Sequence, residues 1–257
     1  MTLTPLVIAK LALVPAVVWL ASLAARRWGH AVSGYLGGFP MIGGPITLYL
    51  AIDFGPAFAA QVATATLAAV AGQAGHLLGF AYVGRAWGPL AGLACGLGAY
   101  VAIALIVAPM GTAPFVALAL AAAGLALAWR LLPRPRGAVS LPAIPPVELW
   151  LRLVAALTLA AVILFGAESF GPVMSGVLLS LPITGAIMPP FTLALYGRDA
   201  LAWLQRGFIT GLTGFASFFF VLAMTVEPWG IALSFLAATA CAVSAVSIYS
   251  RLARPRN

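Results

Sequence analysis

Apolar segments of membrane-spanning length follow one another along most of the chain, separated by short turns that contain glycine, proline and charged residues. An α-helix rises about 1.5 Å per residue, so about 20 apolar residues cross the hydrocarbon core of a bilayer. The pattern predicts nine spanning helices, at residues 5–24, 28–52, 55–83, 88–108, 112–131, 148–166, 170–196, 200–225 and 229–249. We therefore expect an all-α polytopic membrane protein.

The two halves of the chain repeat each other. Residues 5–106 can be laid over residues 147–248 without a gap, at a constant offset of 142 residues. The informative matches are Gly29 with Gly171, Ser33-Gly34 with Ser175-Gly176, Pro40 with Pro182, Gly43 with Gly185, Gly55 with Gly197, Gly72 with Gly214, and Trp87-Gly88 with Trp229-Gly230. Alanine and leucine matches carry little weight in so apolar a chain. The overlay predicts two copies of one four-helix unit.

The repeat divides the chain into three parts. Residues 1–110 form the first four-helix repeat, residues 111–146 a connecting helix and a basic, proline-rich linker, and residues 147–257 the second repeat. Four spans and one connecting span precede the second unit. Because five is an odd number of crossings, the second unit must enter the membrane from the side opposite to the first. The result is a 4+1+4 arrangement, and two copies of one unit that point opposite ways through a membrane are the architecture of many secondary transporters.

Charges in the loops predict the orientation. With the N-terminus outside, Asp53, Glu168 and Glu227 lie on one face, which receives no loop arginine or lysine. The opposite face receives Arg26, Arg27, Arg85, Arg130, Arg134, Arg136, Arg198, Arg251, Arg254 and Arg256. Basic loops stay in the cytoplasm, so we expect a multi-pass protein of the bacterial inner membrane with a cytoplasmic C-terminus.

Composition agrees with the membrane class, because the chain is 63% hydrophobic and only 7% charged. The net charge of +8 would suggest nucleic acid in a soluble protein. Here membrane topology explains the arginines, so we expect no nucleic-acid partner. Residues 21–24 resemble a signal-peptidase site, but the segment has no basic beginning and Lys10 interrupts it. We therefore expect a retained first helix.

The second span of each repeat carries the main candidate for a binding site. Both copies contain Ser-Gly, five residues, Pro, two residues and Gly: Ser33-Gly34 to Pro40 and Gly43, and Ser175-Gly176 to Pro182 and Gly185. Proline removes a backbone donor and clashes with the preceding helical turn. Matched breaks in two inverted halves indicate a substrate site near the middle of the membrane. The alternative is a pair of kinked helices that only shape the bundle.

Ionisable and polar residues inside the spans are few. Lys10 aligns with Arg152, which has Glu148 one helical turn away, and Arg206 lies in the eighth span. All three cations are charged candidates for the site, although reaching for the membrane surface also explains them. Gln73 and His76 share one face of the third span and are candidate substrate-binding residues.

Several classes of protein are disfavoured. No Walker motif, nucleophile elbow or zinc-protease motif is present, and Cys95 and Cys241 lie apart in apolar segments. We therefore expect no catalytic residue, no metal site and no cofactor. No acidic residue lies in the middle of a predicted span, so a bound charge is more readily negative than positive.

The glycine and the proline six residues later in each repeat, Gly34 with Pro40 and Gly176 with Pro182, resemble the small GlpM-like inner-membrane proteins. Those proteins have about the length of one repeat and no assigned molecular activity. The resemblance implies a duplicated and fused version, with the span at 112–131 inserted between the copies.

These observations predict a secondary transporter that moves a small solute, with an anion favoured, by alternating access at broken second and seventh helices. A non-transporting membrane scaffold or assembly protein is the alternative, and it would have a dry, fully packed centre. A lipid-handling enzyme or scramblase would need a lateral groove and polar catalytic groups, and no such groups are found in the sequence.

Overall fold

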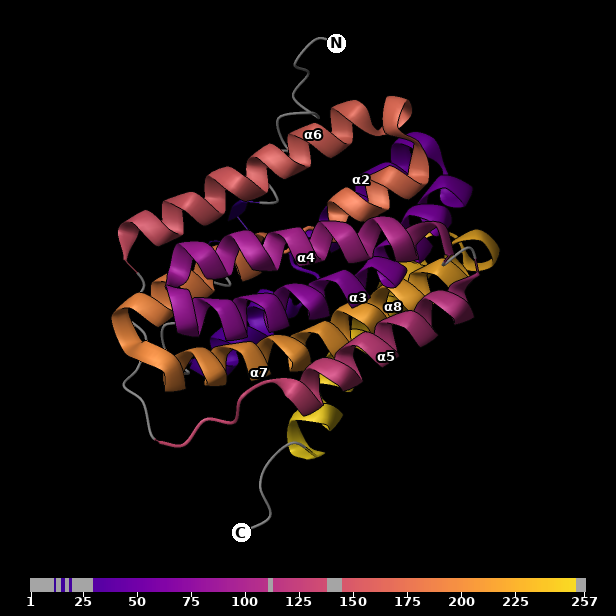
Figure 1. Cartoon of the computed structure of the whole chain (residues 1–257). Helices are drawn as coiled ribbons and strands as arrows, with labels where there is room; N and C mark the ends of the chain where they lie inside the picture. Colours follow the sequence, from indigo (N-terminus) through magenta and orange to yellow (C-terminus); the bar gives the residue numbers. More distant parts are fainter. Residues whose placement is uncertain are drawn as a thin grey trace.

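The computed structural model describes residues 30–110, 113–137 and 145–252, together with positions 12, 15, 16 and 19. The predicted first span at 5–24 therefore has only these few described positions, and Lys10 lies outside the described residues. The described chain is helical, without a β-strand, and its helices lie side by side in one bundle (Figure 1). Several are long and apolar enough to cross a membrane, as the sequence predicts.

A helical stretch over 30–38 precedes the first labelled helix. The helices that follow are α2 (Gly43–Phe54), α3 (Pro56–Trp87), α4 (Pro89–Met110), α5 (Pro114–Leu131), α6 (Pro146–Leu179), α7 (Ile183–Trp229) and α8 (Ile231–Leu252). Four of them begin at a proline, which suits the first helical position because that residue needs no intrahelical N–H bond.

The described residues contain six apolar, mainly helical stretches of membrane-spanning length, where the sequence predicted nine spans. One stretch runs from Pro146 to Trp229 and has 84 residues. As a straight helix it would measure roughly 126 Å, about four times the thickness of the hydrocarbon core of a bilayer. The chain leaves helical geometry within it at Gly171 and Gly197, and Figure 1 shows it folding back near both. Three of the predicted spans fall within this one stretch, and the predicted span at 5–24 lies almost entirely outside the described residues, so the described chain gives six where the sequence predicted nine.

Glycine makes these reversals possible. The residues with positive φ in the described chain are Gly55, Gly88, Gly171, Gly197 and Gly230, with φ between 71° and 95°. A Cβ is strained in this region, so other residues rarely adopt it. Each position matches an end or a beginning of a predicted span to within a few residues, which confirms the predicted turns.

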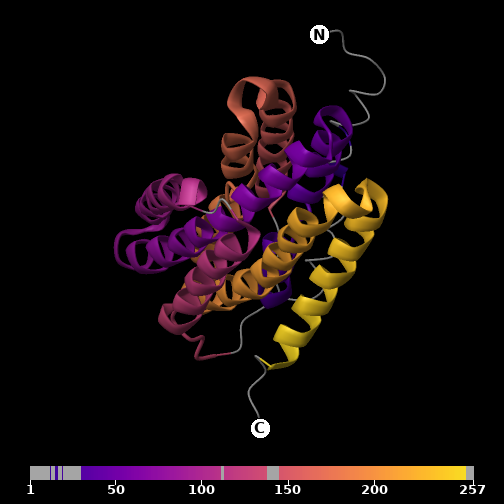
Figure 2. The same cartoon turned by 90° about the vertical axis from the view of Figure 1, so that its right-hand side faces the viewer.

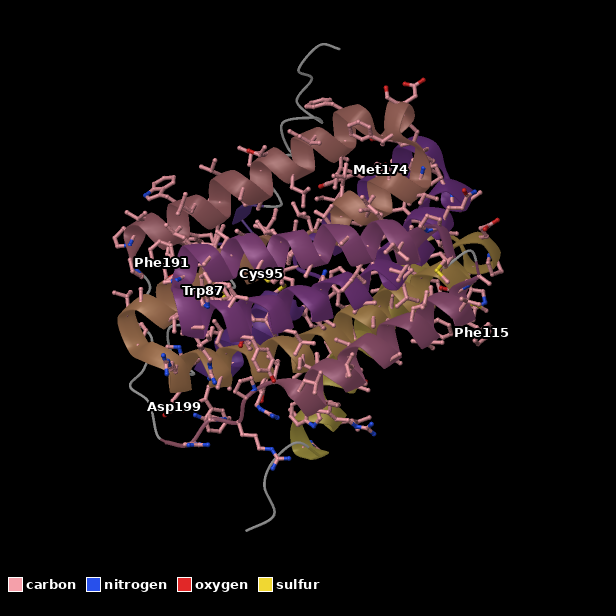
Figure 3. The ribbon with its side chains drawn as sticks, in the orientation of Figure 1. Trp87, Cys95, Phe115, Met174, Phe191 and Asp199 are labelled. Carbon is pink, nitrogen blue, oxygen red and sulfur yellow. The ribbon has the colours of Figure 1, made fainter. Side chains whose placement is uncertain are left out.

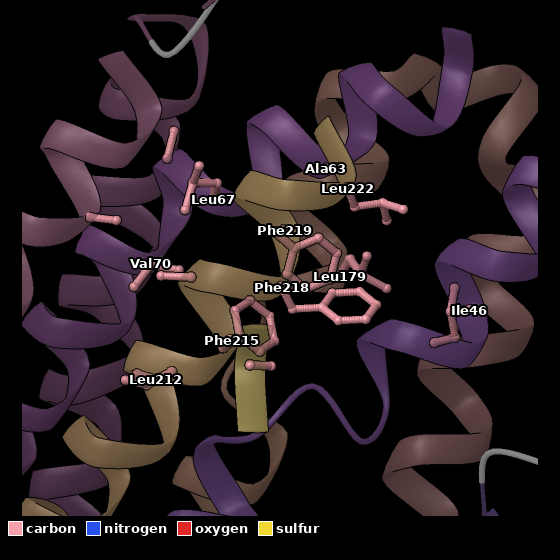
Figure 4. Packing of buried hydrophobic residues seen from close by; sticks show 14 of the residues in the cluster. Ile46, Ala63, Leu67, Val70, Leu179, Leu212, Phe215, Phe218, Phe219 and Leu222 are labelled. Atoms are coloured by element: carbon pink, nitrogen blue, oxygen red, sulfur yellow. The ribbon is translucent and has the colours of Figure 1, made fainter. Parts of the chain in front are cut away.

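The long helices α3 and α7 form the centre of the bundle. Helix α3 packs against α4, α5, α6 and α7, and α8 packs along α7. The 90° view separates α8 from α4, which lie on opposite flanks (Figure 2). Phe215, Phe218 and Phe219 of α7 project toward Leu179 in the buried apolar core (Figure 4). Close packing of these rings fixes how the interrupted helices sit against α7.

A polar region that contains two arginine-containing turns marks one end of the bundle. Arg85 Nη2 donates to the carbonyl of Arg198 at 2.7 Å, and Arg198 Nη2 donates to that of Arg85 at 2.8 Å. The sequence predicted that the turns containing Arg85 and Arg198 lie on the same face, and these hydrogen bonds confirm that the two turns lie together. Trp87 and Asp199 lie at this end, whereas Phe115 and Met174 lie at the other (Figure 3).

Candidate functional site

Both proline-containing segments are interrupted, as predicted. The first is non-helical at 39–42, around Pro40, and the second at 180–182, up to Pro182. Each proline removes one backbone donor, and the helix resumes just after it with bonds from Gly44 N to Pro40 O (2.9 Å) and from Ala186 N to Pro182 O (2.6 Å). The breaks leave backbone carbonyls that need partners inside the bundle.

Side chains from α3 and α4 satisfy carbonyls at the second break. Gln73 Nε2 donates to Ser180 O at 2.6 Å, and His76 Nε2 lies 2.8 Å from Gly185 O. A carbonyl can only accept, so the imidazole carries its proton on Nε2 in this contact. The Tyr100 hydroxyl donates to Val177 O at 2.5 Å. These contacts join residues between 77 and 109 positions apart and hold the break in place.

The two breaks also touch each other. Thr184 Oγ1, just after Pro182, donates to the carbonyl of Gly37, just before Pro40, at 2.7 Å. This bond directly connects the two halves of the chain at their interruptions. Any movement that separates the halves must break it or carry both breaks together.

A cavity of about 60 Å³ lies between the two breaks. One water needs about 10–15 Å³ measured in this way, so the cavity has room for a few waters or one small solute. The polar residues that line it are Ser33, Gln73, His76, Arg152 and Thr184. Among the described residues, no acidic side chain lines it.

Arg152 brings a positive charge to this cavity from α6. Its guanidinium pairs with Glu148 one turn earlier, and the two residues are only 3% and 6% exposed. The predicted pairing is confirmed. The reach toward the membrane surface proposed for Arg152 is not observed, because the side chain lies in the protein interior.

The environments of the two breaks differ in polarity. Gly185 lies beside His76, whose Cδ2 would be 3.5 Å from a Cβ placed on this glycine. Gly43, its counterpart, lies beside Phe219, whose Cζ would be 3.0 Å from such a Cβ. Phe215 from the same helix also lines the cavity. One side of the cavity is therefore polar and the other aromatic.

Two of the predicted site residues are packing positions. A Cβ on Gly34 would meet Leu204 O and lie 2.7 Å from Phe208 N, both in the backbone of α7. A Cβ on Gly176 would lie 2.7 Å from Val62 O and 2.9 Å from Thr66 N, in the backbone of α3. Their lack of a side chain allows close helix contact.

The other predicted residues divide into two groups. Ser33, Gly43, Pro182, Gly185, Gln73, His76 and Arg152 line the cavity, whereas Pro40 and the fully buried Ser175 do not. Arg206 lies elsewhere: its guanidinium donates to Leu132 O at 2.9 Å and to Pro133 O at 3.2 Å, at the end of α5.

The sequence reasoning missed Thr184 and Tyr100. Thr184 stands between Pro182 and Gly185, so its place inside the repeated motif was a usable signal. Tyr100 lies in an ordinary apolar helix, where nothing local distinguishes it.

Comparisons with protein-family models, with curated proteins and with solved structures found no match to this chain. The fold and its apolar helices define a helical protein suited to a membrane, and its function has to be argued from the site itself.

Proposed function

We propose that the protein is a secondary transporter that moves a small anion by alternating access, with its site at the two broken helices. The observation that carries the proposal is the convergence of both breaks on one small cavity with polar groups and a buried arginine. Broken helices that meet at a polar cavity are the recurring design of such transporters. Arg152 and the absence of a lining acid favour a negative solute.

An inverted repeat is part of this proposal, and equivalent contacts support it. Gly34 meets the backbone at positions 204 and 208, and Gly176 meets it at positions 62 and 66. Each residue of the first contact lies 142 positions from its counterpart in the second, so the two contacts are the same interaction with the halves exchanged. Such an exchange is expected of two copies related by a two-fold axis.

The turn glycines support opposite orientations of the copies. Gly88 adjoins Trp87 and Gly197 adjoins Arg198, and these turns share the arginine-containing end of the bundle. In the overlay, however, Gly88 corresponds to Gly230 and Gly197 to Gly55. The two turns that share this end therefore do not correspond to each other in the repeat. Two copies in opposite orientations produce this pattern, because equivalent turns then lie at opposite ends. We propose nine spans in a 4+1+4 order, with the arginine-containing end in the cytoplasm of a bacterial inner membrane.

The GlpM-like resemblance fits a duplicated origin and remains a prediction. A non-transporting scaffold is the competing proposal. It differs in one testable respect, because a scaffold has no need for solute or water to enter the cavity beside Thr184.

Replacing Gly185 by leucine is expected to abolish flux. A Cβ at this position already lies 3.2 Å from Pro182 Cβ, so the larger side chain must fill the cavity or displace its wall. The measurement is flux of small anions, among them acetate and phosphate, into proteoliposomes. The control is Gly98→Leu, because a Cβ on Gly98 has no neighbour within 4 Å. Equal flux through the two variants would remove the site assignment.

A further inference from the structure

A second cavity opens on the side of the bundle, away from the central site. It is a groove of about 540 Å³ between α5, α7 and α8. Its walls are mostly apolar and include Leu118, Ala122, Leu125 and Ala126 of α5. Ala122 and Ala126 are exposed, so the groove opens toward the surroundings of the bundle. In a membrane those surroundings are lipid chains.

The two hydroxyl groups that α7 contributes to the groove are already satisfied within that helix. Thr213 Oγ1 donates to Thr210 O at 2.7 Å, and Ser217 Oγ donates to Thr213 O at 2.8 Å. These hydroxyls need no external hydrogen-bond partner, and the other walls are mostly apolar. The groove therefore suits a hydrocarbon chain better than a polar solute.

One end of the groove is aromatic and basic. Trp129 and Tyr249 stand edge to face with centroids 5.4 Å apart, and Arg130 lies beside them. Trp129 is held by Arg206, whose Cζ lies 4.6 Å from the indole centroid. Arg206 donates its N–H groups to backbone carbonyls at the end of α5, so its donors are committed. Arg130 is exposed and has no ion pair among the described residues.

The dimensions fit one membrane leaflet. Leu118 and Arg130 stand twelve residues apart on α5, which corresponds to about 18 Å along the helix. Half of a hydrocarbon core measures about 15 Å. A chain that begins at Arg130 and follows the groove therefore reaches the middle of the bilayer. Amphipathic aromatic residues are enriched at the membrane surface, where this end would lie.

We propose that the groove binds one anionic glycerophospholipid from the leaflet on the arginine-containing side. An acyl chain lies along α5 and α7, and the phosphate pairs with Arg130 beside Trp129 and Tyr249. Basic pockets between membrane helices recognise anionic headgroups in this way. Among the described residues that line the groove, none is acidic, so nothing there opposes a phosphate. The inference does not depend on transport.

The test measures lipid retained by the purified full chain in detergent, using native mass spectrometry. Phosphatidylglycerol and phosphatidylcholine with identical acyl chains are added in equal amounts. We expect preferential retention of phosphatidylglycerol. Arg130→Gln should weaken that retention about fivefold, the factor for roughly 1 kcal/mol per basic residue at a membrane surface. Ala126→Phe, which fills the groove from an exposed position, should reduce retention of both lipids.

Arg136→Gln is the matched control, because Arg136 is also exposed, follows the same helix and does not line the groove. It should retain phosphatidylglycerol as the unmodified chain does. Equal retention of the two lipids by the unmodified chain would overturn the proposal, as would equal losses in Arg130→Gln and Arg136→Gln. Disulfide crosslinking of two chains through Ala126→Cys in lipid vesicles would also overturn it, because a second copy would then cover the groove.

Discussion

Replacing Arg152 by glutamine is expected to destabilise the protein by about 3–5 kcal/mol, because it leaves the buried carboxylate of Glu148 without its ion-pair partner. The charge that faces the central cavity disappears in the same step, so anion flux should fall as well. Thermal unfolding in detergent measures the first effect, and flux into proteoliposomes measures the second.

The double variant Glu148→Gln with Arg152→Gln separates the two effects. It removes both charges, so stability should return toward that of the unmodified chain, as a double-mutant cycle for a coupled pair requires. Anion flux should stay low, because the cavity still lacks its cation. Recovery of flux together with stability would show that Arg152 acts only as a structural partner of Glu148.

Alanine at Gly34 or at Gly176 is expected to destabilise the bundle by about 1–3 kcal/mol, the cost of overpacking a close contact. The added methyl group would meet backbone atoms of α7 in the first case and of α3 in the second, and backbone cannot turn away as a side chain can. If the two contacts are equivalent, the two losses should be similar. Thermal unfolding in detergent provides the comparison.

Gly98→Ala is the control for both substitutions. It also replaces a glycine within a helix, but a Cβ on Gly98 meets nothing within 4 Å. Alanine has the higher helix propensity, by up to about 1 kcal/mol, so this variant should be neutral or more stable. Unfolding of Gly34→Ala at the same temperature as Gly98→Ala would show that the helices do not pack at Gly34 as described.

Much of the fold could be predicted from the sequence, because individual residues determine the local backbone. Pro40 and Pro182 marked the two helix breaks, and Gly55 and Gly197 marked turns, because proline and glycine act on the backbone at their own positions. The extent of the helices was less predictable. The reversals at Gly171 and Gly197 are so tight that helical hydrogen bonding resumes at once.

The candidate site was predictable only in part. Gly185 and Pro182 could be assigned from the repeat, and they do line the cavity. The sequence could not show that Gly34 and Gly176 are packing residues and not cavity-lining residues. A glycine that is shared by both repeats is compatible with a close helix contact and with a binding site. The bond from Gln73 to Ser180 spans 107 residues, and no local pattern records such a pairing.

Water access to Thr184 distinguishes a transporter from a scaffold most directly. The residue is changed to cysteine in a chain whose Cys95 and Cys241 are replaced by serine, and a small membrane-impermeant thiol reagent is added to vesicles. A transporter gives a reactive Thr184→Cys, and a transported anion slows the reaction. Thr47→Cys is the buried reference, because Thr47 is 0% exposed and does not line the cavity. Labelling of Thr184→Cys as slow as that of Thr47→Cys, from either side of the membrane, would contradict a solute pathway between the broken helices.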